Sequence, residues 1–255
     1  MIGISEEYEK MFQLEEKLWW YRILHERVVK TIQKRYPDRK DITILDVGCG
    51  TGGMLASLRH NGYTNLQGID GSMDAVAFCE KRGFSVTLLN LNEIASFEPD
   101  ARYDVLICND VFCYFNDADL DRLLGELVKR LKPTGLLICN NNAFNVFRGQ
   151  HDLAVGSIRR FVKADFTMLA TKVSLHILES TYWSFVLSPM ILLMRQWQNA
   201  QLRLGWQKPD NAQSDVYLPS EWLNETLYQI VHIEDKLLQR TPFGSSLFVV
   251  LSPAG

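Results

Sequence analysis

Short apolar runs alternate with segments of helical spacing along most of the chain. The runs are four to eight residues long and rich in β-branched side chains, as buried strands are. Between them, apolar residues recur every three or four positions, which is typical of one face of a helix. This alternation predicts an α/β protein with a parallel, doubly wound sheet. The predicted strands are Ile42–Leu45, Asn65–Ile69, Phe84–Leu89, Tyr103–Cys108, Leu136–Cys139, Ser174–Ser180 and Ser245–Ser252, and the predicted helices include Glu6–Arg35, Met73–Arg82, Asp119–Leu131 and Phe161–Val173.

A glycine-rich turn follows the first predicted strand. A strand, a glycine turn and a helix in this order direct backbone N–H groups and a positive helix end toward a ligand, and a Cβ would block the ligand's approach. Asp70 ends the second strand, 22 residues after Gly48, where an acidic side chain can accept from the ribose hydroxyls of an adenosine ligand. The other interpretation is a plain strand–helix turn in which Asp70 caps a helix. The turn contains Gly48, Gly50, Gly52 and Gly53, which fit both G-x-G-x-x-G and G-x-G-x-G.

Composition indicates one folded domain and disfavours several classes of protein. The 255 residues are 47% apolar and carry a formal charge of −3, which supports a large core and gives no general attraction to nucleic acid. The acidic segment Met1–Lys17 lacks the apolar centre of a signal peptide. The most apolar run, Tyr182–Met194, contains Pro189 and is shorter than the roughly 20 residues of a membrane span. Five cysteines without a C-x-x-C pair favour a reducing, cytoplasmic location, and the sequence contains no cluster of metal ligands.

Three stretches together resemble a known family. LDVGCGTGG begins at Leu45, GIDGS at Gly68 and YDVLICNDV at Tyr103. Over about residues 40–145 they resemble the class I S-adenosylmethionine-dependent methyltransferases. An acidic residue directly before the glycines distinguishes this family from NAD-binding enzymes, because Asp46 would face the ammonium of the methionine part. The resemblance implies S-adenosyl-L-methionine as cofactor and S-adenosyl-L-homocysteine as product.

The same resemblance implies further contacts with the cofactor. Asp70 would hold the ribose. Met73, Asn90 and Leu91 would lie against the adenine, although Asn90 stands where relatives carry Asp. Asn109 begins the turn that would form the floor beneath the methyl group. The residues of the glycine turn and its neighbour that would contact the cofactor are Gly48, Cys49, Gly50, Gly52 and Gly71.

The N-terminal segment contains E-x-x-x-W-W-Y-R, from Glu15 to Arg22. This motif resembles a methyltransferase subgroup in which an N-terminal helix closes over the cofactor. Arg22 would then pair with the methionine carboxylate, and Trp20 or Tyr21 would face the sulfonium, since cations favour aromatic faces. The equally weighted alternative is a capping helix whose aromatic side chains pack in the core and whose arginine is solvated.

The acceptor side offers two candidate catalytic residues. Asp110 lies in the turn after the fourth strand, which it would brace; the equally weighted alternative is a helix cap or a backbone hydrogen bond. This chain has Cys113-Tyr114 where some relatives have Glu-His after this turn, so no base can be assigned at that position. His151, beside Asp152, lies in an H-D…R-R-F stretch that leaves the carboxyl edge of the sheet, and is the candidate base or orienting group. The plain alternative for His151 is a loop residue with a satisfied hydrogen bond.

The resemblance also predicts how the chain is divided. We expect one methyltransferase domain over residues 1–255, with a Rossmann-like sheet of seven strands, mostly parallel, whose last strand is antiparallel. Residues 1–36 would form an N-terminal helical cap, residues 40–145 the cofactor-binding core, and residues 182–240 a helical insertion before the last strand. The apolar insertion would be a wall for the acceptor or a homodimer face, or else only extra helices packed on the sheet edge.

The predicted function is methyl transfer to a small-molecule, partly apolar acceptor at oxygen, nitrogen or carbon. The displacement at an activated carbon needs mainly alignment, so a missing base does not exclude catalysis. One alternative is a catalytically silent partner or sensor that binds S-adenosylmethionine or S-adenosylhomocysteine. Another is NAD-dependent oxidoreduction, which would require binding of a nicotinamide nucleotide.

Overall fold

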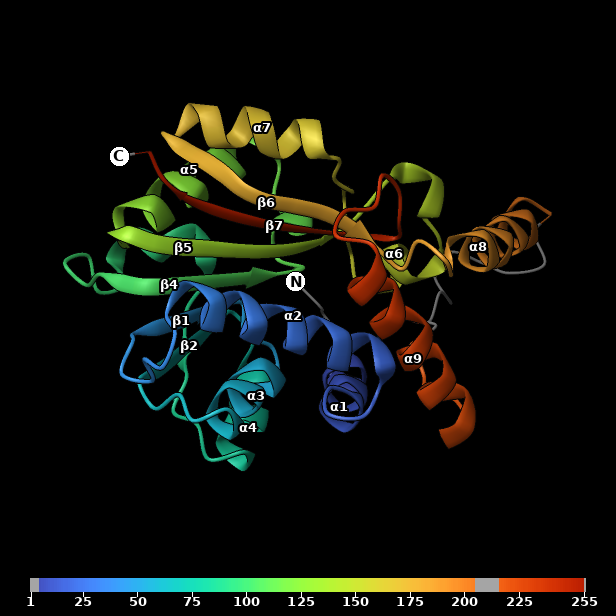
Figure 1. The fold of residues 1–255 in the computed structure, drawn as a ribbon, viewed down its shortest axis with the longest axis horizontal. Helices are drawn as coiled ribbons and strands as arrows, with labels where there is room; N and C mark the ends of the chain where they lie inside the picture. The colour runs from blue at the N-terminus through green and yellow to red at the C-terminus, as the bar shows by residue number, and fades with distance from the viewer. Residues whose placement is uncertain (1–4, 205–215, 255) are drawn as a thin grey trace.

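The computed structural model describes residues 5–204 and 216–254. A seven-stranded sheet runs through it in the order β3-β2-β1-β4-β5-β7-β6 (Figure 1). β7 is antiparallel to both of its neighbours, while β1 to β5 are parallel to one another. This confirms the predicted Rossmann-like sheet with an antiparallel last strand. The strands are β1 (Ile44–Val47), β2 (Leu66–Asp70), β3 (Thr87–Leu88), β4 (Tyr103–Asn109), β5 (Leu131–Asn142), β6 (Leu175–Trp183) and β7 (Ser246–Pro253).

Helices cover both faces of the sheet (Figure 1). On one face, α2, α3 and α9 share a buried apolar cluster with the strands; on the other face, α5 and α7 share a second one. Alternate residues of β4 enter the two clusters, with Val105 on the side of α2 and Leu106 on the side of α5. The helices are α1 (Ser5–Leu14), α2 (Trp19–Arg35), α3 (Gly53–His60), α4 (Met73–Lys81), α5 (Asp117–Lys129), α6 (Gln150–Ala154), α7 (Lys163–Lys172), α8 (Ser188–Arg203) and α9 (Glu221–Leu237), with 3-10 turns η1 (Leu91–Ser96), η2 (Phe112–Tyr114) and η3 (Asn145–Phe147).

The N-terminal segment is two helices instead of the single helix predicted for Glu6–Arg35. α1 ends at Leu14, and α2 begins at Trp19. The backbone N–H of Trp19 donates to Asn224 Oδ1 of α9 at 2.9 Å, so this N–H has a tertiary partner at the break. The carboxylate of Glu15 lies in the break and reaches the N-terminus of α3.

Two sheet elements also differ from the prediction. β3 covers only Thr87–Leu88, because pairing with β2 is limited to Ile69 and Asp70 at the sheet edge. β5 already begins at Leu131, where the predicted helix Asp119–Leu131 was expected to end, and not at Leu136. The register with β4 shifts between Tyr103 and Val105, so these extra residues are accommodated as an irregularity within the strand.

The predicted insertion contributes α8 and α9, and its residues 205–215 lie outside the described part. α9 packs along α2, where Arg27 forms an ion pair with Asp235 and the hydroxyl of Tyr228 donates to Glu26 at 2.5 Å. Contacts between α2 and α9 therefore join the predicted N-terminal cap to the predicted insertion. Across the two described ranges, we find no helix long and apolar enough to cross a membrane.

Candidate functional site

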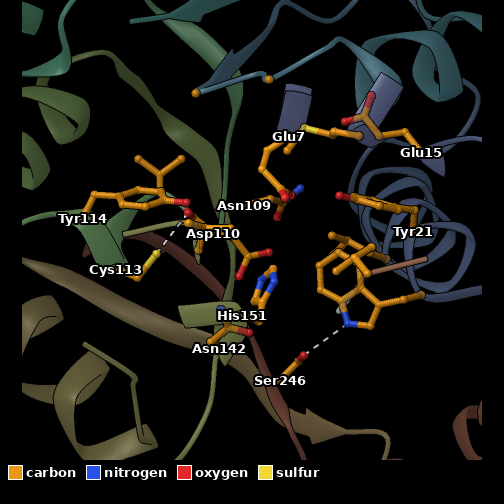
Figure 2. Close-up of a pocket in the computed structure, with 18 of the residues that line it drawn as sticks. Glu7, Glu15, Tyr21, Asn109, Asp110, Cys113, Tyr114, Asn142, His151 and Ser246 are labelled. Carbon is orange, nitrogen blue, oxygen red and sulfur yellow. Dashed lines mark hydrogen bonds between the residues drawn. The ribbon is translucent and has the colours of Figure 1, made fainter. Parts of the chain in front are cut away.

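A cavity of about 610 Å³ lies beyond the carboxyl ends of β1, β2 and β4. This is the edge of the sheet where strand order reverses and where ligands bind in doubly wound folds. Side chains from α1, α2, α6 and α8 close it, and Figure 2 shows Tyr21, Asp110 and His151 turned toward the space from different elements. Of the predicted site residues, the lining includes Trp20, Asp46, Gly48, Cys49, Gly50, Asp70, Gly71, Asn90, Leu91, Asn109, Asp110 and His151.

The glycine turn approaches the cavity with its backbone. Gly48 has φ +72°, and a Cβ there would lie 2.5 Å from Val111 Cγ2. Gly50 has φ +54°, and its N–H donates to Asp70 Oδ2 at 2.9 Å. Because side chains rarely adopt these angles, glycine is required for the turn to take this path. Gly52 belongs to the same turn but faces Cys79 of α4 and does not line the cavity.

Asp46 provides a buried acceptor at the carboxyl end of β1. Its side chain is only 2% exposed, and Oδ2 has no hydrogen-bond partner among the described residues. Burial, with the nearby charges of Glu15 and Asp70, raises the pKa of Asp46 to about 8. A buried carboxyl oxygen without a partner is costly unless a ligand completes it, and an ammonium group would do so.

Asp70 ends β2 on the same side of the cavity. Its two carboxylate oxygens accept the N–H groups of Gly50 and Ser72, each at 2.9 Å. Burial raises the pKa of Asp70, and these N–H groups partly offset that effect. Each oxygen keeps a further lone pair, so the carboxylate can also accept from two ligand hydroxyls. Gly71, Asn90 and Leu91 extend the lining beyond it.

The cap forms an aromatic wall of the cavity. The ring of Trp20 stacks on Trp183 of β6 with centroids 5.5 Å apart and meets Tyr21 edge to face at 5.0 Å. Trp20 Nε1 donates to Ser246 Oγ at 3.4 Å (Figure 2). These aromatic residues therefore line the cavity and also pack in the interior, and the predicted contact with the sulfonium stays a prediction.

The structure does not bring Arg22 or Met73 to this cavity. Arg22 lies over the ring of Tyr228 at 3.7 Å and donates to Glu225 Oε2 at 2.8 Å. It lines a separate hollow of about 520 Å³ between α2 and α3. Met73, in the first turn of α4, is 75% exposed. α2 turns its Trp20 face inward, which directs Arg22 toward α9.

Asn109 and Asp110 place two more buried acceptors at the end of β4. Asn109 Oδ1 and Asp110 Oδ1 have no hydrogen-bond partner in the described ranges. Asp110 Oδ2 accepts from Asn140 Nδ2 at 3.2 Å, and Asn140 Oδ1 accepts from Trp183 Nε1 at 2.9 Å. Burial raises the pKa of Asp110 to about 7. Its backbone φ of +55° is unusual for a non-glycine residue and turns it out of the strand direction.

His151 lies in the first turn of α6 and lines the cavity. Its neighbour Asp152 accepts from Arg160 through both oxygens at 2.9 Å and from the N–H of Gly149 at 2.9 Å. In Figure 2 the imidazole of His151 and the carboxylate of Asp110 point into the same part of the cavity.

Sequence reasoning assigned no role to several lining residues, of which Glu15 is the most informative. Glu15 Oε2 accepts from the N–H of Gly53 at 2.9 Å and from the hydroxyl of Thr51. Burial raises the pKa of Glu15 to about 7. The only sequence signal for a role of Glu15 was its position as the first residue of the E-x-x-x-W-W-Y-R motif. Tyr8 and Asn142 had no local signal at all, since helix ends and sheet register bring them to the cavity.

Comparisons with known proteins agree with this geometry. A family model described as "Methyltransferase domain" matches residues 44–135. A ubiquinone biosynthesis O-methyltransferase from Rickettsia bellii is 29% identical over 153 residues, covering 54% of this chain and 62% of that protein. A malonyl-[acyl-carrier protein] O-methyltransferase from Bacillus cytotoxicus is 30% identical over 127 residues, covering 49% of this chain and 44% of that protein. The chain thus spans less than two thirds of the length of these relatives.

A structural comparison extends the similarity to the whole fold. The crystal structure of a SAM-dependent methyltransferase from Archaeoglobus fulgidus has a TM-score of 0.59 with this chain at 14% identity, covering 98% of this chain and 99% of that one. At 14% identity, the structural likeness shows the fold alone. The family model matches residues 44–135, which include the glycine turn, Asp46 and Asp70. Residues 44–135 are therefore similar to a methyltransferase domain, and the chain has the fold seen in S-adenosylmethionine-dependent methyltransferases.

Proposed function

We propose that the chain transfers a methyl group from S-adenosylmethionine to a small, partly apolar acceptor. The observation that carries this proposal is a set of buried oxygens without hydrogen-bond partners in one cavity. Asp46 Oδ2 lies above the glycine turn, and Asn109 Oδ1 and Asp110 Oδ1 lie at the end of β4. The first fits the ammonium of the cofactor, and the other two fit a proton-bearing group of the acceptor.

The residues present fit the cofactor. Asp46 accepts from its ammonium, Asp70 from its ribose hydroxyls, and Gly48 and Gly50 leave room that a Cβ would fill. When bound, S-adenosylmethionine supplies a methyl group on a positively charged sulfur, which is an activated leaving group. Trp20 and Tyr21 exclude water from that side of the cavity.

Asp110 and His151 are the proposed groups for the acceptor's proton. Asp110 has a pKa of about 7, so near neutral pH a proton can move to or from its carboxylate. Asn140 donates to Oδ2 of Asp110, and Oδ1 has no hydrogen-bond partner among the described residues. Apolar side chains also line the cavity, which favours an acceptor with one polar group on an apolar body. These side chains include Phe147, Val155, Ile158, Met190 and Met194.

The test is production of S-adenosylhomocysteine from labelled S-adenosylmethionine with a panel of phenols, amines and activated carbon acids. We expect transfer to at least one class, and a loss of about tenfold or more in turnover for Asp110→Asn. Asp117→Asn is the matched control, because this carboxylate is exposed and pairs with Arg159 outside the cavity. Binding of S-adenosylhomocysteine without transfer to any acceptor would favour the silent binding protein instead.

The remaining predictions belong to the same proposal. We propose that residues 1–36 and 182–240 act as the cap and insertion of a single domain around the core of residues 40–145. The homodimer stays a prediction: α8 exposes Leu193 and Trp197, and light scattering of the purified protein measures whether it is a dimer.

A further inference from the structure

Glu15 is built into the N-terminus of α3 from a different part of the chain. Its side chain is 7% exposed, and one oxygen accepts both the N–H of Gly53 and the hydroxyl of Thr51. Gly53 lies so close that an added Cβ would be 2.6 Å from Glu15 Cβ. The turn and the carboxylate therefore fit each other without space for another group between them.

The position that Glu15 fills is chemically distinctive. The first N–H groups of a helix after a glycine turn attract anions, and in dinucleotide-binding folds they hold the pyrophosphate. Here the anion is already supplied by the chain itself. Because Asp46 and Asp70 line the same part of the cavity, Glu15 is the third carboxylate around the turn. Such a site repels phosphate and favours a cationic ligand.

Arg82 fixes this arrangement from α4. Its Nη2 lies 3.5 Å from Glu15 Oε2 and donates to the carbonyl of Phe12 at 2.9 Å, while its Nε donates to the carbonyl of Thr51 at 2.8 Å. One buried guanidinium thus joins the end of α1 to the glycine turn. If Glu15 were lost, the segment between α1 and α2 would lose its hydrogen bonds to Thr51 and to the N-terminus of α3.

We propose that Glu15 is a specificity-determining and positioning residue of the cofactor site. Its carboxylate occupies the place of a phosphate at the N-terminus of α3, excludes phosphate-bearing nucleotides such as NAD, and holds the N-terminal cap over the cavity. The inference rests on the proposed function, since it assumes that S-adenosylmethionine is the ligand beneath the cap.

The experiment compares Glu15→Ala, Glu15→Gln and Glu16→Gln by calorimetry with S-adenosylhomocysteine and with NAD. Glu16 is the matched control, because it pairs with the same Arg82 but its side chain is 60% exposed. We expect Glu15→Ala to weaken S-adenosylhomocysteine binding about tenfold or more, the loss expected for hydrogen bonds to a charged group. Glu15→Gln should lose only about threefold, because its amide oxygen still accepts from Gly53 and Thr51.

Two further readouts separate this role from general stability. NAD should not bind the unaltered protein or Glu16→Gln, but should bind Glu15→Ala measurably. Trypsin should cut after Lys10 and Lys17 faster in both Glu15 variants than in Glu16→Gln, without any ligand present. Circular dichroism checks that each variant is folded; if Glu15→Ala is not, Glu15→Gln decides by its affinity and cleavage rate.

The outcomes that contradict the proposal are distinct. NAD binding to the unaltered protein, or Glu15 variants indistinguishable from Glu16→Gln, would overturn the role of Glu15. If the unaltered protein bound no S-adenosylhomocysteine, the proposed function would fail instead, and the cleavage rates would still report whether Glu15 fastens the cap.

Discussion

The high pKa of Asp46 makes cofactor binding sensitive to pH. Burial, together with Glu15 and Asp70, raises this pKa to about 8, and the ionised carboxylate binds the ligand's ammonium more strongly than the neutral carboxyl group does. Below pH 8 the free protein must therefore release a proton when it binds S-adenosylhomocysteine. The ionised fraction grows as pH rises, so the affinity must also rise with pH.

The expected size of the pH effect on affinity follows from the pKa of Asp46. About one tenth of Asp46 is ionised at pH 7 and about one hundredth at pH 6, so the affinity should be about tenfold weaker at pH 6. That ratio corresponds to about 1.4 kcal/mol of binding free energy. Glu15, with a pKa of about 7, changes the affinity in the same direction because its ionised form holds the cap.

Calorimetry at pH 6 and pH 7 measures this directly. Repeating each titration in two buffers of different ionisation enthalpy counts the protons released, and we expect about one at pH 6. Asp46→Asn should bind more weakly at pH 7 and lose most of the pH dependence. Asp104→Asn is the control: burial favours its neutral form, but Lys132 and Thr43 outweigh this and lower the pKa of Asp104, which is already ionised.

A single result would refute the reasoning. If the unaltered protein bound S-adenosylhomocysteine equally at both pH values without releasing a proton, Asp46 would not be the group that meets the ammonium. If the affinity of Asp46→Asn depended on pH as strongly as that of the unaltered protein, another carboxylate would be the group that titrates.

Three further changes test other parts of the site. Because the native pKa of Asp46 lies above its ordinary value, its ionisation costs stability as pH rises from about 4 to 8, so Asp46→Asn should raise the free energy of unfolding at pH 7 by about 1–3 kcal/mol in urea denaturation. Asn140→Ala removes the donor to Asp110 and should lower turnover about tenfold in a transfer assay while S-adenosylhomocysteine affinity stays within about twofold. Gly48→Ala places a Cβ against Val111 at a positive φ, so thermal unfolding should show a loss of about 1–3 kcal/mol, with weaker S-adenosylhomocysteine binding.

The sequence predicted the parts of the fold that depend on local pattern. Strand and helix periodicity is set by neighbouring residues, and the order of alternating elements then limits the sheet to few arrangements. The glycine turn was likewise readable, because positive φ angles at Gly48 and Gly50 need glycine. Asp46 and Asp70 followed from the strand pattern, since each lies at or next to the carboxyl end of its strand.

What the sequence did not reveal depends on partners far along the chain. Glu15 meets residues 51 and 53 through the break between α1 and α2, and that break involves Asn224 on α9. Arg22 was predicted to face the cofactor, yet its partner is Glu225, 203 positions away. Periodicity gives the face of a helix but not which neighbour that face will meet.

The place of β7 has a consequence for the order in which the molecule can be completed. β6 pairs only with β7 in this sheet, and β7 is inserted between β5 and β6 although it is synthesised after both. Until residues 246–253 leave the ribosome, the apolar edge of β5 and all of β6 lack their partner. A nascent or stalled chain that lacks β7 would therefore expose unpaired strand edges to chaperones and to other chains, where they can aggregate.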